Sequence, residues 1–128
     1  MSTNEKSLVA LRGATTCEVD TPQAIHEATA ELLSELLERN GADAGDLVSL
    51  IFTSTPDLIS GFPAGAAREL GLSDVPLLCA AEIAVAGSLP QCIRILAHLN
   101  SATAREDLHH VYLRGATVLR TDLSAPSQ

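Results

Sequence analysis

Aromatic side chains are nearly absent from this sequence of 128 residues, which has no tryptophan, two phenylalanines and one tyrosine. A core must therefore be built from Leu, Val, Ile and Ala, and the hydrophobic fraction of 46% permits one. The charged fraction of only 19% argues against an intrinsically disordered chain. At this length we expect one domain over residues 1–128, with flexible tails at 1–7 and 124–128.

Positive charge is also scarce, since eight basic against sixteen acidic residues give a net charge of −8. This balance argues against nucleic-acid binding and against an anionic membrane surface. No apolar run approaches the ~18 residues of a membrane span. Cys17, Cys79 and Cys92 have no CxxC spacing and cannot all pair within one chain. We therefore expect a reduced, cytoplasmic protein with no metal site and no cofactor.

Apolar runs that alternate with helical patterns predict an α/β (α+β) fold: a mixed β-sheet with helices on one face. Thr21 as N-cap and Pro22 at the first helical position open an amphipathic helix that ends near Gly41. A short helix is expected over 64–70 and a longer one over 89–99. Strands are expected over 8–11, 47–53, 75–79 and 109–113, the last continuing over 116–119. The uncovered face of such a sheet indicates self-association.

Several polar residues stand where apolar elements end, which is where α/β folds place their sites. Arg12 follows the first strand, and Tyr112 lies in the last. Cys79 and Glu82 close the strand from residue 75, and we expect a single turn to set thiol and carboxylate on one side. Arg94 is expected on the following helix. Taken singly, each has an ordinary interpretation as a surface charge, a buried thiol or a half-buried aromatic residue.

Taken together and in order, these residues belong to motifs that resemble one family, the monofunctional chorismate mutases of the trimeric pseudo-α/β-barrel class. The resemblance covers about residues 8–123 and is distinct from the all-helical class. The motifs are Arg12-Gly13-Ala14-Thr15-Thr16, Thr55-Pro56-Asp57-Leu58, Phe62-Pro63-Ala64, Arg68-Glu69-Leu70, Val75-Pro76 with Cys79 and Glu82, Cys92-Ile93-Arg94, His110-Val111-Tyr112-Leu113, and Val118-Leu119-Arg120 with Asp122-Leu123.

The resemblance implies an isomerase that converts chorismate to prephenate in phenylalanine and tyrosine biosynthesis. It also implies a homotrimer with active sites between adjacent subunits. Carried onto this sequence, it assigns Arg12, Arg94 and Tyr112 to the substrate carboxylate, Arg94 also to the ether oxygen, Glu82 and Cys79 to the ring hydroxyl, Phe62 and Ala64 to the pocket wall, and Arg68, Arg120 and Leu119 to the mouth.

The residue types suit a pericyclic rearrangement, which needs no nucleophile, general base or metal. In its transition state, negative charge develops on the ether oxygen and positive charge on the ring. A fixed cation at the first and a fixed anion near the second, as Arg94 and Glu82 would supply, stabilise that state preferentially.

Two positions depart from the family pattern and leave alternatives open. Gly65 stands where a basic residue can occur, and Leu78 where a threonine can occur. A non-catalytic trimeric module that binds a small acid is one alternative. The other is a Rid-type imine deaminase, which also grips a carboxylate with an interface arginine, although Glu82 beside Cys79 favours the mutase.

Overall fold

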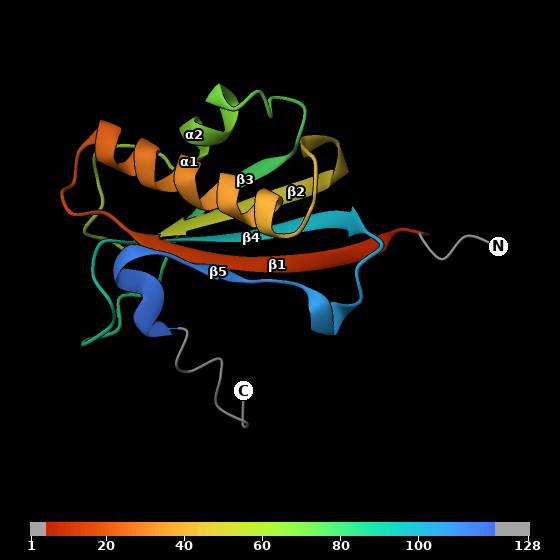
Figure 1. Cartoon of the computed structure of the whole chain (residues 1–128). Coiled ribbons are helices and arrows are strands. Elements are labelled where there is room, and N and C mark those ends of the chain that lie inside the picture. The colour runs from red at the N-terminus through yellow and green to blue at the C-terminus, as the bar shows by residue number, and fades with distance from the viewer. Residues whose placement is uncertain (1–4, 120–128) are drawn as a thin grey trace.

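A computed structural model describes residues 5–119 of the chain (Figure 1). Its centre is one mixed sheet with the strand order β3-β2-β4-β1-β5. The strands are β1 (Ser7–Thr16), β2 (Leu47–Ser54), β3 (Leu77–Ala81), β4 (Cys92–Ser101) and β5 (Val111–Tyr112). Strand β4 is antiparallel to both β1 and β2, whereas β3 runs parallel to β2 and β5 parallel to β1. The predicted mixed sheet is confirmed.

Both α-helices, α1 (Pro22–Arg39) and α2 (Ala64–Glu69), lie on the same face of this sheet, as Figure 1 shows. The buried stripe of α1, which includes Leu32, Leu33 and Leu36, packs against Leu11 and Phe52 of the strands. Burying several such side chains stabilises the fold by roughly 1.5–3 kcal/mol each. Aliphatic residues thus form most of the core in a chain without tryptophan. The predicted placement of the helices on one face of the sheet is confirmed.

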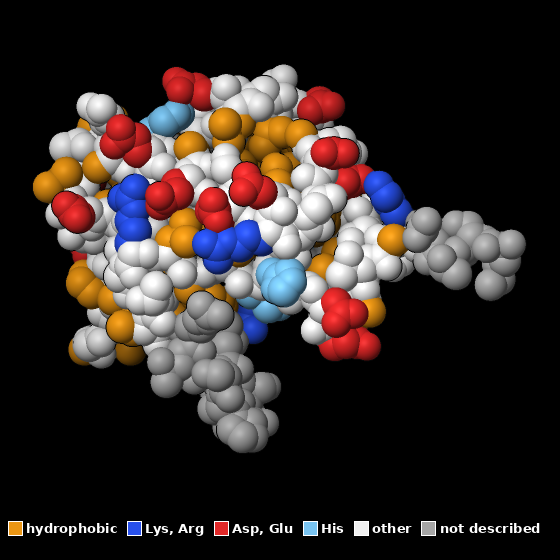
Figure 2. All heavy atoms as spheres, viewed as in Figure 1, with side chains coloured by type: hydrophobic (Ala, Val, Ile, Leu, Met, Phe, Trp, Pro, Cys, Tyr) orange, Lys and Arg blue, Asp and Glu red, His pale blue; other side chains and the backbone are white. Residues whose placement is uncertain are grey.

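Helix α1 begins and ends as the sequence predicts. The side-chain oxygen of Thr21 accepts a hydrogen bond from the backbone N–H of Ala24 at 3.1 Å, which satisfies one of the free donors of the first turn. Pro22 occupies the first helical position, and Gly41 leaves the helix with a φ of +59°. On the solvent side, acidic side chains gather over α1 (Figure 2).

The segment 89–99 is not the helix that the sequence predicts, because residues 92–101 form the central strand β4. Ile93, Ile95, Ala97 and Leu99 are buried, and the residues between them face the other side. This period of two belongs to a strand, whereas the apparent helical spacing used leucines from both faces. Ten residue pairs with β1 and a second ladder with β2 fix the outcome.

The ends of the sheet also differ from the prediction. Strand β1 begins at Ser7, so this residue belongs to the sheet and not to the expected tail. The strand continues past Arg12 to Thr16. Strand β5 has two residues, and the chain leaves it through Arg114 at a φ of +51°. Instead of a further strand, Arg114–Val118 forms a 3₁₀ helix, η3. Shorter 3₁₀ turns are η1 (Ala44–Asp46) and η2 (Arg105–Asp107). The predicted tail at 124–128 lies outside the described residues.

The sheet face opposite the helices, here called the open face, carries the site. Among residues 5–119, η3 covers one end of this face, where Ala116 packs on Ala14 and Cys92. Elsewhere the face presents apolar side chains that are half-buried or exposed, such as Ile51, Leu96 and Leu78. Among the described helices, none is long and apolar enough to cross a membrane.

Candidate active site

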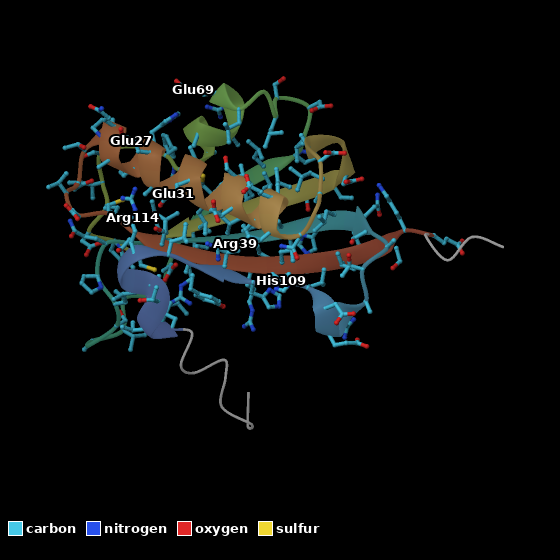
Figure 3. All side chains as sticks on the ribbon, viewed as in Figure 1. Glu27, Glu31, Arg39, Glu69, His109 and Arg114 are labelled. Carbon is cyan, nitrogen blue, oxygen red and sulfur yellow. The ribbon has the colours of Figure 1, made fainter. Side chains whose placement is uncertain are left out.

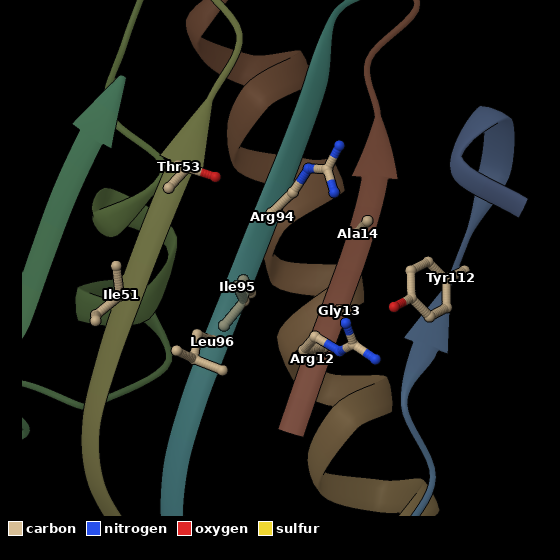
Figure 4. A pocket seen from close by; sticks show the side chains of 9 residues that line it. All are labelled: Arg12, Gly13, Ala14, Ile51, Thr53, Arg94, Ile95, Leu96 and Tyr112. Carbon is tan, nitrogen blue, oxygen red and sulfur yellow. The ribbon is translucent and has the colours of Figure 1, made fainter. Parts of the chain in front are cut away.

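One row of neighbouring residues across four strands builds the candidate site. Thr53 of β2 pairs with Arg94 of β4, Arg94 pairs with Ala14 of β1, and Ala14 pairs with Tyr112 of β5. Because directly paired residues point to the same face of a sheet, all four side chains share the open face. In Figure 4 the Arg94 guanidinium extends over the space between β4 and β1, above the small side chain of Ala14.

Arg94 is held by Glu82, which follows β3 directly. The Nε of Arg94 lies 3.2 Å from one carboxylate oxygen of Glu82 and 3.1 Å from the other. The hydroxyl of Thr53 donates a hydrogen bond to Glu82 Oε2 at 2.6 Å. The Glu82 side chain is only 14% exposed, so water screens this pair less than a surface ion pair. Since the contact uses Nε, the two terminal nitrogens of Arg94 are available to face a ligand.

A second cation stands one row away. Arg12 of β1 pairs with Leu96, whose other neighbour is Ile51 of β2. Together with the row of Arg94, these residues line a cavity of about 280 Å³. The hydroxyl of Tyr112 points toward the guanidinium of Arg12 in Figure 4. Partial burial raises the pKa of Tyr112, although the charges of Arg12 and Arg94 act in the opposite direction, so the phenol remains a hydrogen-bond donor at neutral pH.

Charge and shape together indicate the class of ligand. The site contains two arginines, Arg12 and Arg94, and one carboxylate, that of Glu82, and the residues between the two arginines are mainly aliphatic. An apolar cavity with a few convergent cationic groups suits a small organic anion. Within residues 5–119 no group of three or more His, Cys, Asp or Glu side chains could hold a metal ion.

Cys79 does not share this cavity, so the expected turn that sets it beside Glu82 is wrong. Cys79 is in β3 and pairs with Phe52, whose side chain is in the helix-covered core. Alternation along the strands therefore directs the thiol to the face opposite Glu82. Cys79 instead lines a second hollow of about 370 Å³, together with Ser54 and the loop that carries Phe62. Arg94 likewise reaches the site from a strand, not from the expected helix.

Of the remaining predicted residues, Phe62 lines the second hollow and Leu119 lies at the edge of the first cavity, whereas Ala64 and Arg68 line neither. Phe62 is 77% exposed, so its side chain does not pack in the core. Ala64 is buried in the main core, and Arg68 is exposed on α2. Leu119 packs at the covered end of the open face, against the cluster of Ala14, Cys92 and Ala116. Arg120 lies outside the described residues.

Thr53 is the functional candidate that sequence reasoning missed. Residues 50–52 are all apolar, so hydrophobicity alone does not mark a face of this strand, but the period of two along any strand places Thr53 on the same face as Ile51. What it could not supply was the partner, since Glu82 is 29 residues away and meets Thr53 only through the β2–β3 pairing.

Comparison with known proteins gives a consistent result. A family model described as chorismate mutase type I matches residues 8–123. The chain is 53% identical over 116 residues to chorismate mutase AroH of Thermus thermophilus, covering 90% of this chain and 95% of that protein. It is 42% identical over 115 residues to chorismate mutase AroH of Bacillus subtilis (strain 168), covering 89% and 91%. A solved chorismate mutase from Clostridium thermocellum superimposes with a TM-score of 0.85 at 46% identity, covering 86% of this chain and 98% of that one.

Proposed function

The chain belongs to the chorismate mutase type I family and is therefore an isomerase that converts chorismate to prephenate, and we propose that it does so on the open face, between Arg94 and Glu82. The observation that carries this assignment of the site is the ion pair between these two residues at the edge of an aliphatic, cationic cavity. The activity places the enzyme in aromatic amino acid biosynthesis.

The reaction moves electrons around a ring of six atoms without transferring a proton. As the ether carbon–oxygen bond breaks and the carbon–carbon bond forms, the ether oxygen becomes partly negative and the ring partly positive. The terminal nitrogens of Arg94 would donate hydrogen bonds to that oxygen, and the Glu82 carboxylate would stabilise the ring charge. Both groups are already oriented by their contacts, so little reorganisation accompanies the charge separation.

The substrate must also be held folded, with its two reacting carbons in contact. A guanidinium presents parallel donors that match a carboxylate, so Arg12 would grip one end of the dianion and Tyr112 would add a hydroxyl donor. Positioning of this kind converts a rare conformer of the free substrate into the bound one. The aliphatic residues Ile51 and Leu96 would exclude water from the ring.

We propose further that each site is composite, in a homotrimer. Within one chain, Arg94 and Glu82 lie over the open face, whereas Cys79 and Phe62 border the second hollow. A neighbouring copy that covers the apolar open face would bring its second hollow, with Arg68 near the mouth, to complete the cavity. The exposed Phe62 then has a ligand or a partner to pack against.

Two finer points belong to this proposal. We expect one catalytic domain over residues 1–128, since the five strands found within residues 5–119 share one sheet. We also expect it to work in the cytoplasm, where Cys17, Cys79 and Cys92, all free in the structure, remain reduced.

The direct test is the loss of chorismate absorbance with purified protein, with prephenate measured as product. A mixed assembly tests the composite site. Arg94→Ala and Phe62→Asp should each be nearly inactive, the second because it sets a negative charge against an anionic substrate. Co-expressed, the two variants should recover part of the wild-type rate, because some interfaces then contain both intact halves. A mixture that never exceeds its parents would place each site within one chain.

A further inference from the structure

The backbone of Arg12 is held by a side chain that the proposed function does not use. The Arg12 N–H donates a hydrogen bond to Nδ1 of His110 at 3.0 Å. His110 directly precedes β5, whose pairing with β1 begins only at Gly13 and Val111. The imidazole nitrogen of His110 therefore takes the place of the backbone carbonyl that would accept this hydrogen bond if the parallel pairing of β1 and β5 were longer.

His110 is itself fixed through its neighbour. The side chain of Asn40 donates to the carbonyl of His109 at 2.8 Å, and its Oδ1 accepts the N–H of His109 at 2.8 Å. The same amide donates to the carbonyl of Leu36 at 2.8 Å, which anchors it to the end of α1. In Figure 3, His109 lies below the C-terminal part of this helix. Asn40 thus connects the segment that carries the His110 ring to the C-terminal end of helix α1.

The hydrogen bond specifies the protonation state of the ring. Nδ1 accepts only when it carries no proton, so His110 must be neutral with its proton on Nε2. Partial desolvation lowers the pKa of His110, and the charge of Arg12 lowers it further. The other ionisable residues that line the same cavity as His110 are His98 of β4 and Arg105 of η2. No carboxylate is among the residues that line this cavity, so nothing there favours the imidazolium.

We propose that His110 is a positioning residue whose neutral ring holds the backbone of Arg12, so that the Arg12 guanidinium meets the substrate carboxylate. This inference rests on the proposed function, because it takes Arg12 as a carboxylate ligand. A proton on Nδ1 breaks the hydrogen bond and sets a second positive charge beside Arg12. Release of the β1 backbone at this point weakens substrate binding without touching Arg94 or Glu82.

The kinetic signature is therefore a change in KM more than in kcat. Arg12 would hold the carboxylate equally in the ground state and the transition state, and loss of such uniform binding raises KM. In the wild type, KM should rise as the pH falls through the titration of His110, below the ordinary histidine pKa of about 6.5. The kcat at saturating substrate should change little over the same range.

Two substitutions separate this role from a merely structural one. Asn places an amide oxygen close to the position of Nδ1 but does not titrate, so His110→Asn should keep kcat/KM within about threefold at pH 7.5 and lose the rise in KM at pH 5.5. His110→Leu removes the acceptor and should raise KM about fivefold at both pH values, the effect of one net hydrogen bond. His109→Leu and His98→Asn are the matched controls, and both should keep the wild-type pH profile.

A measurement on the unsubstituted protein keeps the proposal testable if a variant fails to fold. In ¹⁵N-labelled protein, a scalar coupling across the hydrogen bond should join the Arg12 amide nitrogen to His110 Nδ1 at pH 7.5 and vanish as the pH falls through the titration of the His110 ring. The proposal is overturned if His110→Leu keeps the wild-type KM at both pH values, if His110→Asn keeps the acid rise in KM, or if the coupling is absent at pH 7.5. A wild type that does not convert chorismate would contradict the proposed function instead, whatever the coupling shows.

Discussion

The ion pair between Arg94 and Glu82 spans strand β2, which lies between the strand that carries Arg94 and the strand that Glu82 follows. Thr53 of β2 stands in the gap and donates its hydroxyl to Glu82. Three segments that are separate in the sequence therefore converge on one carboxylate. This arrangement fixes the two opposite charges before any substrate arrives.

Removal of the Arg94 cation should abolish most of the activity. We expect Arg94→Ala to lower kcat by about 10²–10³, as for loss of one oriented donor to a developing oxyanion. Arg94→Lys should recover little, because an ammonium lacks the planar fork of donors. Steady-state rates of chorismate loss test this, with Arg39→Ala on α1 as the control, since Arg39 pairs only with Glu35 on the same helix in the described contacts. A decrease in kcat of tenfold or less for Arg94→Ala would indicate that the active site lies elsewhere.

The hydroxyl of Thr53 should contribute through Glu82. Thr53→Val keeps the shape of the side chain but leaves Glu82 Oε2 without its 2.6 Å partner, and we expect kcat to fall about tenfold. Thr53→Ser retains the hydroxyl and should remain within about threefold of the wild type. If Thr53→Ser lost as much activity as Thr53→Val, or if Thr53→Val kept the wild-type kcat, the hydrogen bond to Glu82 would not be the reason for the effect.

The kcat should be nearly flat from about pH 7 to 9. Partial burial raises the pKa of Tyr112, and burial raises the pKa of Cys92 to about 11, so neither group loses its proton in this range. The rearrangement itself transfers no proton, so kcat should be nearly equal in ordinary and heavy water. Cys79→Ser should keep substantial activity, since the thiol is expected to act only as a weak hydrogen-bond partner. A bell-shaped profile with a large solvent isotope effect would instead indicate rate-limiting proton transfer.

Substitution by alanine should have opposite effects on stability at two glycine positions. Gly41 has a φ of +59° after α1, where a side chain is strained, so Gly41→Ala should lower the free energy of unfolding by about 1 kcal/mol. Gly65 lies within α2 with open space around its Cα, so Gly65→Ala should be neutral or stabilising by up to about 1 kcal/mol. Chemical denaturation of both variants measures the difference. Destabilisation by Gly65→Ala equal to that of Gly41→Ala would argue against this account.

The sequence by itself determined the elements whose signals are local. The Thr21-Pro22 start, the apolar stripe of α1 and the stop at Gly41 act within a few residues of one another. The residues expected to carry the chemistry were also readable, because their types and order match a family that the comparisons show.

Only the tertiary structure decided what residues 92–101 are and which side chains meet. The apolar residues of this segment fit both a helical and a strand spacing, so its own sequence does not decide between a helix and a strand. Pairing with β1 on one side and β2 on the other does, because a central strand satisfies its backbone through segments some 40 to 90 residues away in the sequence. The pairing of β3 with β2 likewise directs Cys79 and Glu82 to opposite faces, since alternation along a strand follows from its register in the sheet, and that register is a property of the whole fold.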